Sequence, residues 1–201
     1  MKKYLKISAV LAVITLVCAV VLASINLLTA DLIAKHEEEK KEETIKAIYD
    51  EYDHYKTESY DELVANYPNK NIDSVISERI TVFNDKAEAS PKGYIYSVSK
   101  RNAYGIVSLM VAISPSNTIV QVEFLENGQS FASTVDNWVK SNFISKGVEK
   151  HEAGFVSDDK VGSELSDQEL YDLNVKCTAT YGATTVKELV IAALNTQKEV
   201  A

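Results

Sequence analysis

The stretch that decides the fold is GYIYSVSKRNAYGIVSLMVAISPSNTIVQVEFLE, residues 93–126. Its runs are rich in Val, Ile and Tyr and partly alternate apolar with polar residues, as half-buried strands do. Short polar connections at residues 100–102 and 114–117 interrupt it, and the second contains Pro115 where a type I turn accepts proline. Strands joined by such tight turns predict an antiparallel meander. We expect strands at residues 80–83, 93–100, 103–114 and 118–126.

A sheet of this kind needs helices on its apolar face, and the following sequence offers them. Residues 130–143 carry apolar side chains at helical spacing, namely Phe131, Val135, Trp138, Val139 and Phe143. Residues 186–194 form another amphipathic run. Between them, residues 144–176 are polar and predict a surface loop with a short helix at 165–173. The sequence therefore predicts an α+β domain over residues 79–201.

A helical segment is predicted ahead of the sheet, over residues 31–78. Residues 35–56 are rich in Glu and Lys and place apolar side chains on one helical face, namely Ile45, Ile48, Tyr49, Tyr52 and Tyr55. Ser59 and Glu62 then match a capping box, which predicts the start of a new helical turn. Pro68 ends that turn.

Residues 1–30 are predicted to be an N-terminal transmembrane anchor. The 24 residues at 7–30 contain no charged residue and no His, and a helix rising ~1.5 Å per residue would cross a ~30 Å hydrocarbon layer. Lys2, Lys3 and Lys6 precede this run, which favours a cytoplasmic N-terminus and an extracytoplasmic body. Two alternatives are a secretory signal peptide, whose apolar region is normally only ~7–15 residues, and a lipoprotein anchor on Cys18.

Composition and charge argue against several function classes. The formal charge is −8, and the only charges in residues 1–30 are basic, so the rest of the chain is strongly acidic and a poor match for nucleic acid. Cys18 and Cys177 form no metal or redox motif. His36, His54 and His151 are scattered along the chain, without a recognisable catalytic triad. We therefore expect no metal site and no side-chain catalyst.

The most informative local feature is TATYGATT, residues 178–185, directly ahead of the amphipathic run at 186–194. Thr185 and Glu188 make a second capping box, which predicts Thr185 as the N-cap and places Thr184 just outside the helix. Unpaired amides and the positive end of the dipole at a helix start favour a phosphate group. The local sequence leaves both a structural cap and a phosphate-binding role open.

Gly182-Ala183-Thr184 ahead of a C-terminal helix resembles the flavinylation motif of the FMN-binding domain family. That family includes the flavin-carrying G subunit of the Rnf electron-transport complex and the C subunit of the sodium-translocating NADH:quinone reductase. In both, a membrane helix and a charged juxtamembrane helix precede an extracytoplasmic α+β domain, and this chain shows the same order. Residues 93–94, 104–107 and 119–122 are also similar to the family's central strands.

The resemblance implies that FMN is attached to Thr184 by a phosphoester bond. The residues implied around the cofactor are Thr180, Tyr181, Gly182, Ala183 and Thr185. The implied function is that of a redox subunit of a respiratory ion-translocating complex in the cell membrane. Its implied partners are integral membrane subunits and a flavin transferase. The flavin would supply the redox chemistry, and the protein would supply position and electrostatics.

Several features depart from the family's pattern. Tyr181 stands where Ser or Thr is usual, Val186 lacks a hydroxyl that many members have, and the expected upstream acid is missing. The family's Glu-Thr-Pro-Gly-like loop is not recognisable, and residues 129–132 occupy roughly its place. An alternative is therefore an anchored extracytoplasmic binding module of the same fold that has lost the flavin. A pilin-like subunit is disfavoured, because residues 7–30 contain no acid.

Overall fold

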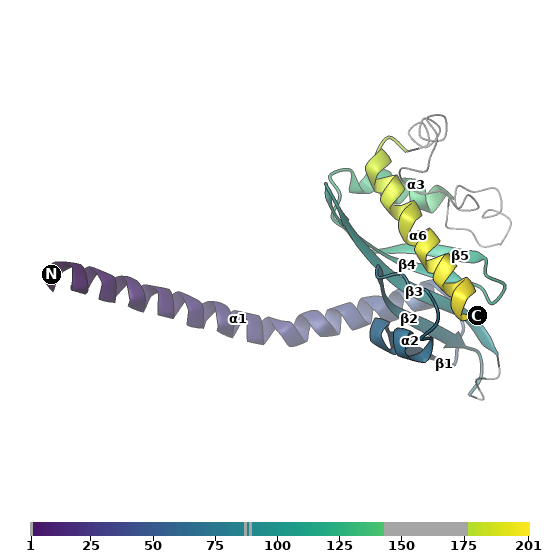
Figure 1. Cartoon of the computed structure of the whole chain (residues 1–201), viewed down its shortest axis with the longest axis horizontal. Coiled ribbons are helices and arrows are strands. Elements are labelled where there is room, and N and C mark those ends of the chain that lie inside the picture. Colours follow the sequence, from purple (N-terminus) through teal and green to yellow (C-terminus); the bar gives the residue numbers. More distant parts are fainter. Residues whose placement is uncertain (1, 87, 89, 143–176) are drawn as a thin grey trace. The chain divides into compact units, whose positions relative to one another are not determined.

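The computed structural model describes residues 2–86, 88, 90–142 and 177–201. The chain divides into two compact units, Met1–Ile45 and Lys46–Ala201. Helix α1 spans Lys2–Ile48 (Figure 1). The first unit holds this helix as far as Ile45, and the rest of the helix belongs to the second unit. The predicted loop at 144–176, with its short helix at 165–173, lies outside the described residues.

Helix α1 is continuous from Lys2 to Ile48, so the apolar run and the charged run after it belong to one element. None of the helices in the described part of the chain combines the length and the apolarity that a membrane crossing requires. The predicted transmembrane span at residues 7–30 is thus not confirmed, and the helix that contains it continues without a break into the charged residues 35–46.

The second unit is built on an antiparallel sheet with the strand order β1-β2-β3-β4-β5 in the described residues (strands labelled in Figure 1). The strands are β1 His54–Ser59, β2 Ile76–Phe83, β3 Pro91–Asn102, β4 Gly105–Ile113 and β5 Ile119–Asn127. Each strand pairs with the next along the chain, so the predicted meander is confirmed. The register sets Tyr96 opposite Val111 and Val111 opposite Val122, which places apolar side chains side by side on one face.

Strand β1 corrects the helix predicted over residues 35–56. Helix α1 ends at Ile48, and β1 pairs with β2 so that His54 lies opposite Phe83. Tyr52 and Tyr55 have helical spacing, yet Tyr55 belongs to the strand and the two rings contact each other with centroids 6.1 Å apart. The backbone of β1 finds its partners in β2, which is distant in sequence, and side-chain spacing alone does not reveal such pairing.

The predicted capping box at Ser59 is confirmed. Ser59 is the N-cap of helix α2, Tyr60–Asn66, and its Oγ accepts a hydrogen bond from the Glu62 amide at 3.4 Å. The Glu62 carboxylate in turn accepts from the Ser59 amide at 2.7 Å. These two bonds satisfy amides that the helix start would otherwise leave without partners.

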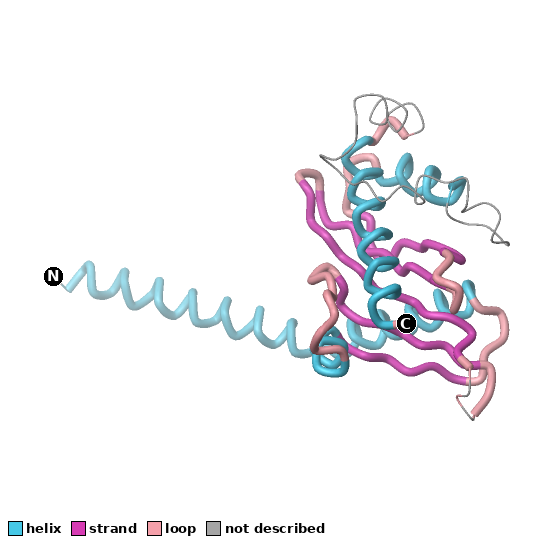
Figure 2. The backbone as a smooth tube through the Cα atoms, turned by 45° about the vertical axis from the view of Figure 1, so that its right-hand side comes forward, coloured by secondary structure: helices cyan, strands magenta, loops and turns pink. Residues whose placement is uncertain are grey.

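Helices α2, α3 (Ala132–Asn142) and α6 (Thr180–Val200) pack on the sheet, and Figure 2 shows the C-terminal helix lying across it. Their apolar side chains form one core with the strands, including Tyr96, Leu109, Val122, Trp138 and Leu189. Trp138 is only 5% exposed, as expected for a core residue. The predicted α+β class is thus confirmed, and the helix expected at 130–143 is confirmed over residues 132–142, with Phe143 outside the described residues.

Candidate functional site

Helix α6 begins more than a turn earlier than the sequence predicted. Its first residue is Thr180, its N-cap is Ala179, and no side chain caps it. The Ala183 amide already donates to the Ala179 carbonyl at 3.0 Å. Thr184 is therefore a helical residue and lies beyond the first turn, where the influence of the helix terminus on a charged group has weakened. The predicted position of Thr184 at the mouth of the helix is wrong.

Thr185 is not an N-cap but an interior residue of α6. Its Oγ1 donates to the Tyr181 carbonyl at 2.9 Å, the bond to the preceding turn that a helical threonine can make. Glu188, the expected partner in the capping box, instead forms an ion pair with Lys100, with 2.8 Å between Oε2 and Nζ. The predicted capping box at Thr185 is therefore wrong.

A polar cluster joins three elements beside the start of α6. Asn102, at the end of β3, donates from Nδ2 to Thr185 Oγ1 at 2.9 Å and to Gln129 Oε1 at 3.0 Å. Gln129 Nε2 returns a bond to Asn102 Oδ1 at 3.0 Å, and the Tyr104 amide donates to the same oxygen at 2.8 Å. Gln129 and Thr185 are both buried. The cluster fixes the β3–β4 hairpin and the segment after β5 against α6.

Gly182 allows helix α3 to approach α6 closely. A Cβ atom at this position would lie 2.6 Å from Val135 Cγ2 and 3.4 Å from Gln129 Oε1. The first distance is far shorter than a van der Waals contact, so a side chain at Gly182 would force the two helices apart. The glycine of the sequence motif thus has a packing role.

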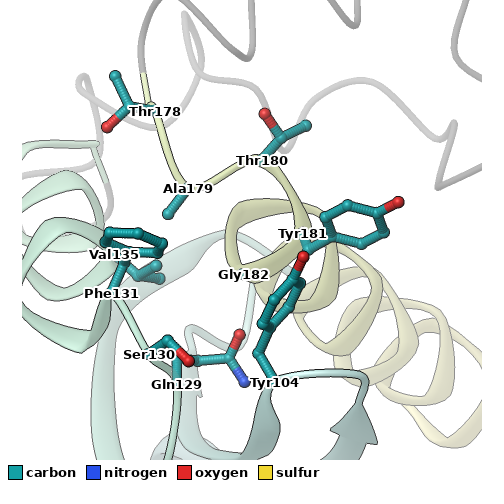
Figure 3. A pocket seen from close by; sticks show the side chains of 10 residues that line it. All are labelled: Tyr104, Gln129, Ser130, Phe131, Val135, Thr178, Ala179, Thr180, Tyr181 and Gly182. Atoms are coloured by element: carbon teal, nitrogen blue, oxygen red, sulfur yellow. The ribbon is translucent and has the colours of Figure 1, made fainter.

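A cavity of about 270 Å³ lies at this junction (Figure 3). Tyr104 and Tyr181 stand on one side of it, and Phe131 and Val135 stand on the other. The remaining lining residues are Gln129, Ser130, Thr178, Ala179, Thr180 and Gly182. The cavity therefore has largely aromatic and aliphatic walls, with the buried Gln129 amide among its few polar groups.

Three aromatic rings at the cavity are exposed to solvent. The exposed fraction is 48% for Tyr104 and 65% for both Phe131 and Tyr181. The rings of Tyr104 and Tyr181 contact each other with centroids 5.5 Å apart and planes inclined by 58°. Exposed aromatic side chains gathered around a cavity are typical of a surface that binds a ligand or a partner.

The structure brings three of the six predicted site residues to this cavity, namely Thr180, Tyr181 and Gly182. Ala183 and Thr185 are buried and do not line it. Thr184 is partly exposed and lies one turn along the helix from Thr180 and Tyr181. The face that carries Thr184 continues to Glu188, so this threonine lies between the Tyr104–Tyr181 contact and the Lys100–Glu188 ion pair.

Sequence reasoning did not identify the residues that other elements contribute to the site. Asn102 and Tyr104 come from the β3–β4 hairpin, and Gln129 and Phe131 come from the segment after β5. In the sequence, Phe131 has the spacing of a helical core residue and residues 129–132 occupy roughly the place of a missing loop, so neither pattern indicated a ligand site. The strand pattern located the hairpin, but nothing in the pattern shows that it contacts α6.

Other polar groups lie away from this junction. His54 lies on β1, where Nδ1 is 2.9 Å from Asp53 Oδ2 and Nε2 is 3.3 Å from Glu88 Oε1, and its ring stacks on Phe83. Within the described ranges there is no cluster of His, Cys, Asp and Glu side chains that could hold a metal ion.

Comparison with known proteins gives one family match. Residues 1–48 match the family described as RnfG N-terminal region. This match covers about a quarter of the chain and corresponds to helix α1. No curated protein matches the chain.

Proposed function

We propose that this chain, an RnfG-like subunit of the Rnf electron-transport complex by its N-terminal region, carries FMN bound through its phosphate to Thr184. The family match supports the electron-transport assignment, and RnfG is a flavin-binding subunit. The observation that carries the cofactor proposal is a partly exposed threonine one helical turn from a cavity with aromatic walls.

The residues present fit a flavin mononucleotide. The volume of about 270 Å³ is near the lower end of small-molecule sites, which suits one ring system with the rest of the molecule outside. The walls formed by Tyr104, Tyr181 and Phe131 suit the faces of a planar aromatic ring. Side chains one turn apart on a helix have Cβ atoms ~5–6 Å apart, so a phosphate on Thr184 would lie close to the cavity.

Lys100 supplies the positive charge that a phosphodiester on Thr184 needs. Its Nζ is 2.8 Å from Glu188 Oε2, and Glu188 is four residues beyond Thr184 on the same helical face. The Lys100 side chain is 43% exposed, and its ammonium group would have to share its charge between Glu188 and a phosphodiester on Thr184. The Lys100 ammonium group, and not the start of the helix, would then stabilise the negative charge of the phosphate in this acidic chain.

The neighbouring threonine is unsuited to attachment. Thr185 is 4% exposed, and its hydroxyl both donates to the Tyr181 carbonyl and accepts from Asn102. A phosphoester there would remove the proton that Thr185 donates to Tyr181 and would place a charged group in a buried position. Thr178 and Thr180 line the cavity and are the natural controls.

The bound flavin would accept electrons and pass them on. The protein's own residues would hold it, orient it and balance its charge, and no side-chain acid or base is required. We further propose that the chain works at the cell membrane, with its folded unit outside the cytoplasm, and that a flavin transferase attaches the cofactor.

Helix α1 supports the proposal that integral membrane subunits are partners. Large apolar side chains on this helix are 51 to 68% exposed, namely Val10, Leu11, Val13, Ile14, Leu16, Val17, Val20, Val21, Leu22 and Ile25. A continuous apolar surface of this kind needs an apolar partner. Cross-linking from α1 in native membranes would identify those neighbours.

The cofactor proposal is tested by intact mass measurement of the full chain purified from its native membranes. We expect a flavin-sized adduct on the wild type, its loss in Thr184→Ala, and its retention in Thr184→Ser, Thr178→Ala and Thr180→Ala. A wild-type chain of bare mass would overturn the proposal. The chain would then be better described as an α+β binding module, whose partner could be sought by affinity capture.

A further inference from the structure

We infer, resting on the proposed function, that Tyr104 and Tyr181, whose ring planes are inclined by 58°, form an aromatic wall that binds the isoalloxazine ring of the flavin without help from the covalent bond. The cavity beside α6 is then a ring-binding site in its own right, and Thr184 is a tether outside it. Tyr181 is one of the positions at which this chain departs from the family's pattern, so the wall is a feature of this chain's own sequence.

The two tyrosines are held in place although their rings are exposed. Tyr181 belongs to the first turn of α6, and the Tyr104 amide donates to Asn102 Oδ1 at 2.8 Å. Asn102 is itself bonded to Thr185, so the backbones beneath the two rings are connected through one side chain. Backbones that are already tied together lose little conformational entropy when a ligand binds, which favours affinity.

The wall that faces the tyrosine pair is apolar. Figure 3 shows Phe131 and Val135 across the cavity from the tyrosine pair. Gly182 lies between the two walls, and because it has no side chain, Val135 comes within 2.6 Å of where a Cβ would be. The cavity thus has mainly apolar walls, and its volume of about 270 Å³ suits a ring system with its polar tail outside.

The position of Thr184 indicates which ligand would occupy the cavity. This residue is partly exposed and lies one turn from Tyr181 on the same helix, outside the lining of the cavity. A nucleotide joined to it through phosphate would carry its ring beside the tyrosine pair and its charge beside Lys100. A ring that already binds in the cavity would present its phosphate to Thr184 before the bond is made.

The test uses the full chain with Thr184→Ala, which cannot carry the covalent cofactor, and riboflavin as the probe. Riboflavin lacks the phosphate, so its binding reports the ring site alone. Stacking on tyrosine quenches flavin fluorescence, and we expect saturable quenching. Tyr104→Leu and Tyr181→Leu should each weaken binding by about tenfold, since each removes one ring from the wall. Tyr104→Phe and Tyr181→Phe keep a ring and should retain binding.

A matched control is available in another tilted tyrosine pair. The rings of Tyr52 and Tyr55 are 6.1 Å apart with planes inclined by 57°, and neither residue lines the cavity. Tyr52→Leu should leave riboflavin binding unchanged. Absence of quenching in the folded Thr184→Ala chain, or equal weakening by Tyr52→Leu and Tyr181→Leu, would overturn the inference. Riboflavin binding by a chain whose wild type has bare mass would support the ring site while the covalent proposal fails.

Discussion

Asn102 Nδ2 lies 2.9 Å from the hydroxyl oxygen of Thr185, so the end of β3 is hydrogen-bonded to a side chain in the second turn of α6. The same amide group donates to Gln129, which lines the cavity. One asparagine therefore joins the hairpin, the helix and the segment that forms the far wall.

Thr185→Val should destabilise the folded chain by about 1–2 kcal/mol, because it leaves an Asn102 N–H without its partner in a partly buried cluster. Urea unfolding of the purified chain measures the change. Thr178→Val alters an exposed residue and should change the free energy of unfolding by less than ~0.5 kcal/mol. Equal effects of the two substitutions would show that the Asn102–Thr185 bond contributes nothing.

Two sequence patterns with a hydroxyl residue three positions before a glutamate predicted a capping box, and only one of them forms it. Ser59 and Glu62 form the predicted capping box, because β1 ends at Ser59 and the chain must start a helix there. Thr185 and Glu188 have the same spacing, but their partners are Asn102 and Lys100, which are distant in sequence. A local pattern predicts a cap only where no distant partner competes for the side chains.

Partners that are distant in sequence also explain which strands could be predicted. Strands β2 to β5 carry alternating or continuous apolar runs and short turns, so their own sequences identify them. Strand β1 is a polar edge strand, HYKTES, and its tyrosine continues the helical spacing of the residues before it. Only its pairing with β2 makes it a strand. Likewise, the motif at 182–184 could be recognised, whereas the aromatic walls beside it come from separate elements.

Gly182→Ala should destabilise the chain, although the same change normally stabilises a helix by ~1 kcal/mol. The new methyl group would lie 2.6 Å from Val135 Cγ2, and valine has little rotamer freedom to move away. We expect a net loss of about 1–3 kcal/mol in the free energy of unfolding, as is usual for overpacking.

Val135→Ala provides the control for this clash. It should cost stability by itself but relieve the added methyl group, so that Gly182→Ala costs less in the Val135→Ala background than in the wild type. Strictly additive effects in this double-mutant cycle, measured by urea unfolding, would contradict the close approach of α3 and α6 at Gly182.

The capping box at Ser59 should make stability depend on pH in the acidic range. The Ser59 amide and then its hydroxyl donate to the Glu62 carboxylate and hold its pKa below the ordinary value of 4.5. Because the folded-state pKa is lowered, this contribution is present above the unfolded-state pKa and is lost as the pH falls through the folded-state pKa. NMR titration of the Glu62 carboxyl should give a midpoint below 4.5, and Ser59→Ala should raise it.

Glu62→Gln should make the free energy of unfolding fall less steeply as the pH is lowered through the acidic range. Glu51→Gln, at an exposed position, should leave this pH dependence as in the wild type. Identical slopes in the acidic range for the wild type and Glu62→Gln would show that the carboxylate does not stabilise the start of α2.

Two buried tyrosines should make the folded chain sensitive to alkali. Burial raises the pKa of both Tyr49 and Tyr96 above the ordinary value of 10.0, and Tyr96 Oη donates to Gln197 Oε1 at 2.7 Å. Above pH ~10 the unfolded chain would release these protons while the folded chain keeps them. Stability therefore falls as the pH rises, by up to about 1.4 kcal/mol per pH unit for each tyrosine.

Tyr96→Phe separates the hydrogen bond from the titration. At neutral pH it should lower the free energy of unfolding by about 1–3 kcal/mol, because the buried Gln197 oxygen loses its donor. Above pH ~10 its stability should fall less steeply than that of the wild type, because one tyrosine no longer titrates on unfolding. Tyr181→Phe, at an exposed ring, should keep the wild-type slope. Parallel alkaline slopes for the wild type and Tyr96→Phe, measured by urea unfolding at several pH values, would show that Tyr96 ionises equally well in the folded chain.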